Sequence, residues 1–477
     1  MRMALLSLAV WLTGSAAHAQ GPSAAWYSIE TDAGARLGHA SFEVTRGSDG
    51  ETVIQTHTLL LQEQGAAAPT RITTRTVQEK DAEGRTLTLE SVTTTGRART
   101  VDRARIEPGV AIVTRETAVE TREIRIPLPP EARFDNGEPL LAAWDRRASP
   151  RLEFPRFNLD ALAVERVVIE PASAPAEHGV LIRRHYQGDV LTAIARLDVD
   201  DLGRMRRSSQ PLFGATLAVR AVDRQTALAA HEPFRVFEST ATPSPVRIPD
   251  SAARGRLRYS FAFRDGFEFA APQTGQQRVR TETAGTMVVD VCAGCGPGLA
   301  KDPASLAEAL RPTAWLQSDH PRIKSLADPI AQRALSESAR MQALSDLARP
   351  YVADIDFAGH FSALETVARR RGDCTEAAVL LAALGRAAGI PTKVASGLVY
   401  AWGNYRGASN SFIPHSWVVA YVDGEWKSLD AALDGFGSTH IALTVSDGEP
   451  RSIAAAGQLA GLLDLEAVNE VRPRPAP

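Results

Sequence analysis

Apolar and polar residues alternate along most of the chain between Trp26 and Val291, in short runs separated by turn residues. The stretch TRITTRTVQEKDAEGRTLTLESVTTT predicts two strands around a turn at 82–84. The run AIARLDVDDLGRMRRSS predicts a second hairpin, which turns near Leu202 and Gly203. Further strand candidates are EIRIPLP, VERVVIEP, VLIRRHY and GTMVVDVCAG. We therefore expect this part of the chain to form antiparallel sheet with one polar face.

From about Leu299 the apolar residues recur every three or four positions, which is typical of helices. PASLAEALRPTAWL and DPIAQRALSESARMQALSDLARPYV both show this spacing. The best-marked helix follows Asp373, which can act as its N-cap, with Glu376 completing a capping box. Gly389 and Pro391 end it. The runs TKVASGLVY, HSWVVAYV and EWKSLDAAL then predict strands. The pattern as a whole predicts an α+β fold with a β-rich N-terminal half.

The first residues, MRMALLSLAVWLTGSAAHAQ, have the pattern of an export signal. A basic residue at Arg2 precedes a short apolar run, and small residues at Ala17 and Ala19 form an A-x-A cleavage site. The apolar run is too short for a permanent membrane anchor, so we expect no stable membrane insertion. The expected location of the mature protein is the periplasm or the extracellular space.

These patterns divide the chain into five parts. Residues 1–19 are the expected signal peptide, and residues 20–240 an antiparallel β-rich domain. Residues 241–298 form a linker and a β segment, because Pro-rich ESTATPSPVRIPDS marks a boundary. Residues 299–450 form the helix-and-strand core, and residues 451–477 a C-terminal helix with a disordered tail.

The composition of the 477 residues is that of an ordinary globular protein, with 44% hydrophobic and 23% charged residues. The net charge of −3 gives no general attraction to nucleic acid, so no nucleic-acid partner is expected. The oligomeric state is left open by these features.

Two of the three cysteines stand together as Cys292 and Cys295, in VCAGCGPG. A local disulfide, a redox-active dithiol and a zinc site are the three alternatives. The glycines and proline after Cys295 argue against a dithiol that opens a helix, and a second zinc-ligand pair is missing. The third cysteine, Cys374, is then odd in a chain that we expect to be exported, so it is either a free reactive thiol or part of an intermolecular bridge.

Cys374 stands at the start of the best-marked helix, where backbone N–H groups and the helix dipole favour a thiolate. A base for it is suggested by the hairpin around Asp423 and Gly424, which form a strong two-residue turn signal. In that register Val422 pairs with Glu425, and His415 and Asp430 become diagonal neighbours on one face. The hairpin therefore predicts a His and an Asp within hydrogen-bonding reach of each other.

The segments RGDCTEAAVLLAALGRAAGIPTKVASGLVY and PHSWVVAYVDGEWKSLDA resemble the core of the transglutaminase-like superfamily. That family has Gly-Asp-Cys at the start of a helix, a His followed by Trp on a strand, and an Asp at the end of the next strand. The resemblance covers about 299–443 and implies a papain-like fold. It assigns catalytic roles to Cys374, His415 and Asp430. One departure is Ala431, where the family commonly has Pro.

The resemblance implies a Cys-His-Asp acyl-transfer enzyme that attacks a glutamine carboxamide or peptide amide and forms a thioester. An amine acceptor would give a cross-link, and water would give deamidation or peptide hydrolysis, so transglutaminase, deamidase and protease chemistry all stay open. The expected partner is a protein or peptide substrate. No cofactor and no metal is expected, since the chemistry requires none and no EF-hand-like loop is present. Tyr400, Trp402, Tyr405 and Phe412 could line a substrate groove or pack in the core. Two alternatives are a non-catalytic scaffold of this fold and a binding function in the β-rich half.

Overall fold

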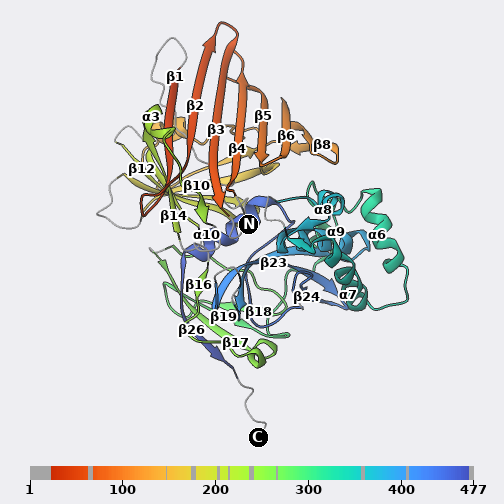
Figure 1. Cartoon of the computed structure of the whole chain (residues 1–477). Coiled ribbons are helices and arrows are strands. Elements are labelled where there is room, and N and C mark those ends of the chain that lie inside the picture. Colours follow the sequence, from red (N-terminus) through yellow and green to blue (C-terminus); the bar gives the residue numbers. More distant parts are fainter. Residues whose placement is uncertain are drawn as a thin grey trace. The chain divides into compact units, whose positions relative to one another are not determined.

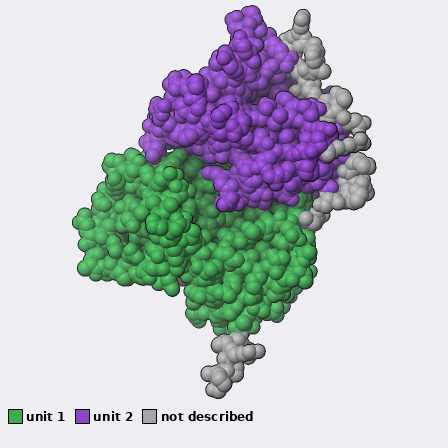
Figure 2. Space-filling model, turned by 180° about the vertical axis from the view of Figure 1, so that it is seen from behind, with its two compact units in different colours: residues 1–4, 212–214, 237–477 green, residues 5–211, 215–236 purple. Residues whose placement is uncertain are grey.

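A computed structural model of the chain describes residues 23–62, 68–146, 148–172, 179–200, 205–212, 215–235, 241–264, 267–355, 360–403, 405, 408–433 and 435–471. The expected signal peptide and the tail beyond residue 471 lie outside these residues. The chain divides into two compact units, coloured separately in Figure 2. Unit 2 holds residues 5–211 and 215–236, and unit 1 holds residues 237–477 with two short stretches, 1–4 and 212–214. Of the described residues, 48% lie in strands and 19% in helices, which confirms the α+β class with a large N-terminal sheet.

Unit 2 is built on one antiparallel sheet in the order β8-β7-β6-β5-β4-β3-β2-β1-β14-β13-β12-β11-β10-β9, with β15 added in parallel beside β3. Figure 1 shows the long strands β1 to β6 side by side. The strands are β1 (Ser23–Thr31), β2 (Arg36–Gly47), β3 (Gly50–Gln62), β4 (Thr70–Lys80), β5 (Thr86–Thr95), β6 (Ala98–Glu107), β7 (Val110–Glu116), β8 (Thr121–Pro127), β9 (Leu152–Asn158), β10 (Ala163–Pro171), β11 (Val180–Gln187), β12 (Val190–Val199), β13 (Met205–Leu212), β14 (Ala215–Val222) and β15 (Phe234–Arg235).

The predicted hairpins of this sheet are present. Strands β4 and β5 pair on either side of the turn at 82–84, and β12 pairs with β13, although 201–204 lie outside the described residues. The prediction of one polar face is wrong for β10, where the consecutive residues Val167, Val168 and Ile169 are all buried. Because neighbouring strand residues point to opposite faces, both faces are covered there. The short helices are α2 (Glu138–Ala143) and α3 (Arg224–Ala227), and Leu141 of α2 packs in the same cluster as Val167 and Ile169.

Unit 1 contains two antiparallel sheets. The first has the order β18-β19-β17-β26, and the second has the order β16-β23-β22-β25 with β24 beside β23. Their strands are β16 (Thr242–Pro243), β17 (Leu257–Phe263), β18 (Gln277–Arg280), β19 (Thr286–Val291), β22 (Thr392–Ala401), β23 (Ser411–Val422), β24 (Glu425–Leu429), β25 (His440–Ser446) and β26 (Leu463–Glu470). A two-stranded pair, β20 (Asp354–Ile355) and β21 (Arg371–Gly372), stands apart from both sheets.

Helix α9 packs on the β22–β23 face of the second sheet, and α6, α7 and α8 pack around α9; Figure 1 shows this group of helices on one side of unit 1. The helices of unit 1 are α5 (Pro303–Glu308), α6 (Pro321–Ala331), α7 (Glu337–Ala348), α8 (Ala363–Arg369), α9 (Cys374–Ala387) and α10 (Pro450–Gly461), with 3₁₀ turns at 250–254 and 349–351. Leu380 and Leu384 of α9 are fully buried against Val418 of β23 in this core. Truncating one such leucine to alanine costs about 2–5 kcal/mol, so the packing holds α9 firmly against the sheet.

Three elements of the structure differ from those that the sequence predicted. The segment 328–352, which has one continuous helical spacing, contains the end of α6 and the whole of α7. Helix α7 has its own N-cap, because the side chain of Ser336 accepts a hydrogen bond from Ala339 N–H. Helix α5 ends at Glu308, well before the end of its predicted segment. The strand β26 was not predicted, and it pairs with β17.

Cys292 and Cys295 form a disulfide, the first of the three alternatives for this pair. No helix within the described ranges has both the length and the apolar character needed to cross a bilayer.

Candidate active site

Cys374 is the first residue of α9, and the loop before it is held in place by two carboxylates. The side chain of Asp373 accepts a hydrogen bond from Thr375 N–H at 2.7 Å. Glu376 accepts from Asp373 N–H at 2.9 Å and from Phe361 N–H at 3.0 Å. The predicted capping box is therefore formed. Burial and the nearby Asp373 raise the pKa of the Glu376 carboxyl well above its usual value.

Gly372, two residues before the cysteine, permits this close packing. A Cβ atom at Gly372 would lie 2.6 Å from the Cβ of Glu376. Any side chain there would push against the carboxylate that fixes the loop. The Gly-Asp-Cys sequence thus has a steric explanation in the structure, independent of any resemblance.

His415 lies on β23, and the hairpin between β23 and β24 has the register that the sequence predicted. Val422 pairs with Glu425, and the turn residues Asp423 and Gly424 have φ angles of 52° and 83°. Positive φ at both central positions is the geometry of a type I′ turn. The Nε2 atom of His415 lies 2.6 Å from Oδ2 of Asp430, so the two diagonal neighbours are in direct contact.

The His415 ring also contacts the Cys374 side chain, which is half-buried. Nε2 of the ring is taken by Asp430, so Nδ1 is the nitrogen left for the thiol. Burial opposes a charged imidazole, but the Asp430 carboxylate and Cys374 outweigh it and raise the pKa of His415 well above its ordinary value. The structure therefore brings together the three residues that the sequence predicted.

Asp430 is 3% exposed and accepts four hydrogen bonds, two on each oxygen. Oδ1 accepts from the backbone N–H groups of Ala432 and Leu433, at 2.7 and 3.0 Å. Oδ2 accepts from His415 and from a second histidine, His440, at 3.1 Å. Burial disfavours the charged carboxylate, but these partners hold the pKa of Asp430 far below its usual value.

Sequence reasoning missed His440. It stands at the first position of β25, and its contact with Asp430 depends on β25 pairing with β22, not with its sequence neighbour β24. The segment GFGSTH before β25 has no local signal that points to this contact.

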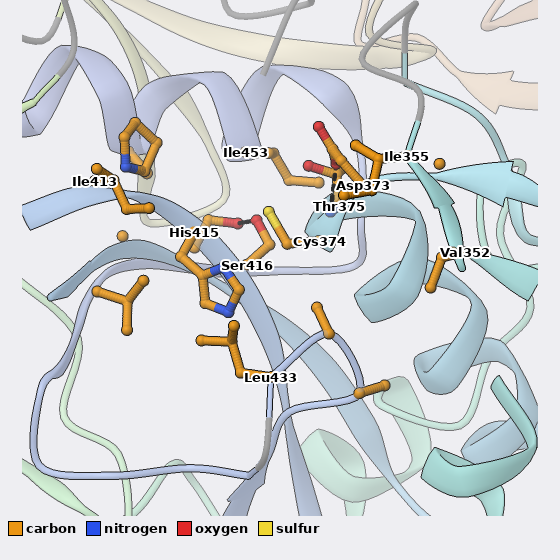
Figure 3. A pocket seen from close by; sticks show the side chains of 18 of the residues that line it. Val352, Ile355, Asp373, Cys374, Thr375, Ile413, His415, Ser416, Leu433 and Ile453 are labelled. Carbon is orange, nitrogen blue, oxygen red and sulfur yellow. Dashed lines mark hydrogen bonds between the residues drawn. The ribbon is translucent and has the colours of Figure 1, made fainter. Parts of the chain in front are cut away.

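A cavity of about 690 Å³ opens beside these residues. Figure 3 shows Cys374 from the tip of α9 and His415 from β23 on the wall of this pocket, with Ile413, Leu433 and Ile453 around them. Three of the four aromatic residues singled out in the sequence, Tyr400, Trp402 and Tyr405, line it. The fourth, Phe412, is fully buried in the core against the rings of Tyr259 and Tyr400.

Within the described part of the chain, one group of three potential metal ligands has its ligand atoms within 4.8 Å of one another. It consists of His415, Asp430 and His440. The contact of 2.6 Å between His415 Nε2 and Asp430 Oδ2 is a hydrogen-bond distance. Two ligands of a tetrahedral zinc ion, each about 2.1 Å from the metal, lie about 3.4 Å apart. The observed geometry is that of a carboxylate between two imidazole donors.

Comparison with known proteins gives a family for part of this site. Residues 324–431 match the family model described as the transglutaminase-like superfamily. Unit 1 contains a transglutaminase-like domain. The matched residues include Cys374, His415 and Asp430, and they end just before the segment that carries His440.

Two solved structures are similar to this chain at low identity. A "putative cysteine protease" from Cytophaga hutchinsonii is 17% identical, with a TM-score of 0.28, over 46% of this chain and 85% of that one. A "putative protease" from Parabacteroides distasonis is 13% identical, with a TM-score of 0.20, over 82% of this chain and 70% of that one. Among curated proteins, none matches.

Proposed function

We propose that this protein is a cysteine-dependent acyl-transfer enzyme that acts on glutamine carboxamides or peptide amides. The observation that carries the proposal is one chain of contacts on a pocket wall. Cys374 at the tip of α9 touches the His415 ring, and Asp430 holds that ring from the other side at 2.6 Å. A nucleophile, a base and a residue that orients the base are the parts that covalent catalysis requires.

In the proposed reaction, His415 holds the proton of Cys374 as an imidazolium, and Asp430 stabilises its charge. The raised pKa of His415 supports this charge distribution. The sulfur attacks the carbonyl carbon, a C–S bond forms, and the carbonyl electrons move to oxygen. When the carbonyl re-forms, the C–N bond breaks and His415 gives its proton to the departing nitrogen. A glutamine side chain then releases ammonia, a peptide bond releases an amine, and a thioester remains on Cys374.

The thioester is resolved by water or by a primary amine. His415 takes a proton from the attacking group, the C–S bond breaks, and the thiolate–imidazolium pair returns. Water gives deamidation or peptide hydrolysis, and an amine gives a cross-link. The apolar and aromatic wall of the pocket, with Trp402 and Leu433, would limit the access of bulk water to the thioester.

The oxyanion of the intermediate needs donors, and the backbone N–H of Cys374 at the helix N-terminus is one candidate. A second candidate is the hydroxyl pair of Ser396 and Ser416, which line the same pocket with their oxygens 2.8 Å apart. One hydrogen of the pair is used in the bond between the two hydroxyls. The other hydrogen is available to a ligand in the pocket.

The export pattern at the N-terminus supports a periplasmic or secreted location for this activity. An oxidising compartment agrees with the disulfide between Cys292 and Cys295. The proposed substrate is therefore a protein or peptide outside the cytoplasm.

Intact-mass spectrometry of the protein with glutamine-containing peptides tests the proposal. We expect an adduct with the mass of the peptide less ammonia on Cys374, and none on Cys374→Ser. A peptide mass increase of about one dalton would assign water as the acceptor, and a new conjugate in the presence of a primary amine would assign cross-linking. Shorter peptides would assign proteolysis.

Alkylation with iodoacetamide gives an independent check. Cys374 is the one cysteine of three that lies outside the disulfide, so uptake of one label reports on it directly. We expect fast labelling below neutral pH and slow labelling in His415→Ala. Labelling at the rate of an ordinary thiol, together with no adduct across the peptide panel, would favour the non-catalytic scaffold.

A further inference from the structure

His440 shares one carboxylate oxygen with the proposed catalytic histidine. Its Nε2 lies 3.1 Å from Asp430 Oδ2, the same atom that lies 2.6 Å from Nε2 of His415. The other oxygen, Oδ1, is already occupied by two backbone N–H groups. The Asp430 carboxylate thus cannot rotate freely, and the two imidazoles divide the acceptor capacity of Oδ2 between them.

The protonation state of His440 follows from its surroundings. The ring is 3% exposed, and burial together with the charge of His415 outweighs the opposing contacts with Asp430 and Gly437 and lowers the pKa of His440, so the ring is neutral near neutral pH. A neutral ring that contacts a carboxylate through Nε2 carries its hydrogen on that nitrogen. The lone pair on Nδ1 then accepts from Gly437 N–H at 3.2 Å. The Gly437 carbonyl lies 3.1 Å from the same Nδ1 and would be an acceptor only for a protonated ring.

The ring is also fixed by its aromatic neighbours. It meets Trp417 edge to face with centroids 5.2 Å apart, and it lies 4.8 Å from the ring of Phe436. It meets the His415 ring at 5.6 Å and 65°. Among the described residues, His415 and Asp430 are the titratable groups that it contacts. His440 does not line the pocket, so a substrate in the pocket would not touch it.

We infer that His440 is a positioning residue of the proposed triad. Its Nε2–H occupies one acceptor direction of Asp430 Oδ2, which confines His415 to the other direction and keeps Nδ1 of His415 aimed at Cys374. By sharing the carboxylate charge, it also limits how tightly Asp430 holds the imidazolium. His415 must later give its proton to the departing nitrogen, and an imidazolium held too tightly is a poor acid. This inference rests on the proposed function of the same site.

Two substitutions separate the hydrogen bond of His440 from its packing. His440→Phe keeps an aromatic ring of similar size and removes the donor to Asp430. His440→Gln loses the ring but keeps an N–H₂ group that reaches about as far as Nε2. If the donor matters, Phe impairs the site and Gln restores it. If only the packing matters, the order is reversed.

The first readout needs no substrate. The titration of His415 is followed by NMR of the imidazole nitrogens in the full-length protein and both variants. In His440→Phe the carboxylate charge is left to His415 alone, so we expect its titration to move upward in pH. In His440→Gln it should return toward the parent value.

The second readout is turnover of the best peptide found by mass spectrometry. We expect kcat to fall about tenfold or more in His440→Phe, in line with losing one hydrogen bond to a charged group. KM should stay within about twofold, since His440 lies outside the pocket, and His440→Gln should recover most of the loss. Unchanged His415 titration and kcat in His440→Phe would overturn the inference. So would an effect on KM alone, or equal losses in both variants that follow their thermal stability.

Failure of the proposed function gives a different result. If the parent protein forms no adduct with any peptide, yet His415 titration still moves upward in His440→Phe and back in His440→Gln, then His440 positions His415 in a site without acyl-transfer activity. If the parent turns over peptide but the titration does not move, the enzyme proposal holds and the role of His440 is refuted.

Discussion

The buried acid Glu449 gives this protein a stability that should fall as the pH rises. Glu449 is the N-cap residue of α10, the helix whose Pro450 and Ile453 line the pocket. Its Oε2 accepts from Asp447 N–H at 3.0 Å, and Ser452 Oγ contacts its Oε1. Burial and the neighbouring Asp447 carboxylate raise the pKa of Glu449 to about 7.

The size of the effect follows from that value. The unfolded chain has a pKa of 4.5 at this residue, so the folded protein binds the proton more tightly. The stabilising contribution is fully present below pH 4.5 and is lost as the pH rises through about 7. Over that pH range, the contribution of Glu449 to the free energy of unfolding falls by about 3 kcal/mol.

Glu449→Gln removes this pH dependence while keeping the shape of the side chain. Its amide oxygen can accept from Asp447 N–H, and its N–H₂ can donate to Ser452. We expect the variant to gain stability over the parent as the pH rises from 5 to 8, by up to about 3 kcal/mol. For a unit of this size that corresponds to roughly 6–12 °C in Tm.

Calorimetry or urea unfolding of parent and variant at several pH values between 5 and 8 measures the difference. Glu466→Gln is the control, because Glu466 is an exposed residue of β26 and its substitution should change stability by no more than about 0.5 kcal/mol. If the stability difference between Glu449→Gln and the parent does not grow with pH, the assignment of a buried, protonated Glu449 is refuted.

Three further predictions concern the site. Gly372→Ala should slow Cys374 alkylation and lower stability by about 1–3 kcal/mol, because the new methyl group would meet Glu376 at 2.6 Å; unchanged labelling and Tm would contradict the steric argument. Asp430→Asn should slow acyl transfer by about 100-fold or more and bring the alkaline limb of the acyl-transfer rate down in pH, since the buried carboxylate is what raises the pKa of His415; pH–rate profiles measure both. Treatment with EDTA should leave alkylation and turnover unchanged, because the contact of 2.6 Å between His415 and Asp430 is a hydrogen bond; a loss that zinc restores would show that the site binds metal.

The sequence was most informative where the signals were local. The capping box at Asp373 and Glu376 and the turn at Asp423 and Gly424 depend on residues within a few positions of each other, and both formed as predicted. Because the turn sets the register of the hairpin, it also placed His415 beside Asp430.

Features that depend on contacts between distant chain segments could not be predicted from local sequence signals. His440 reaches Asp430 only because β25 pairs with β22, across more than forty residues of chain that include β23 and β24. Strand β26 begins with the alternating run LDLEA, but this run follows helix α10 directly and is short, and its partner β17 lies some two hundred residues earlier. The burial of Val167 and Ile169 on one face of β10 likewise involves Leu141 of α2, which belongs to a different part of the sequence.

The pairing of β26 with β17 has a consequence for how unit 1 is made. Strand β17 lies between β19 and β26, and its ladder with β26 runs from Leu257 opposite Glu470 to Phe263 opposite Leu463. A ribosome delivers the first of these partners long before the second, so the nascent chain carries β17 with one open edge while some two hundred further residues are synthesised. Exposed edges recruit other strands. Chains that are truncated before β26 should therefore aggregate or be degraded. Only chains that include β26 would then accumulate with a folded unit 1.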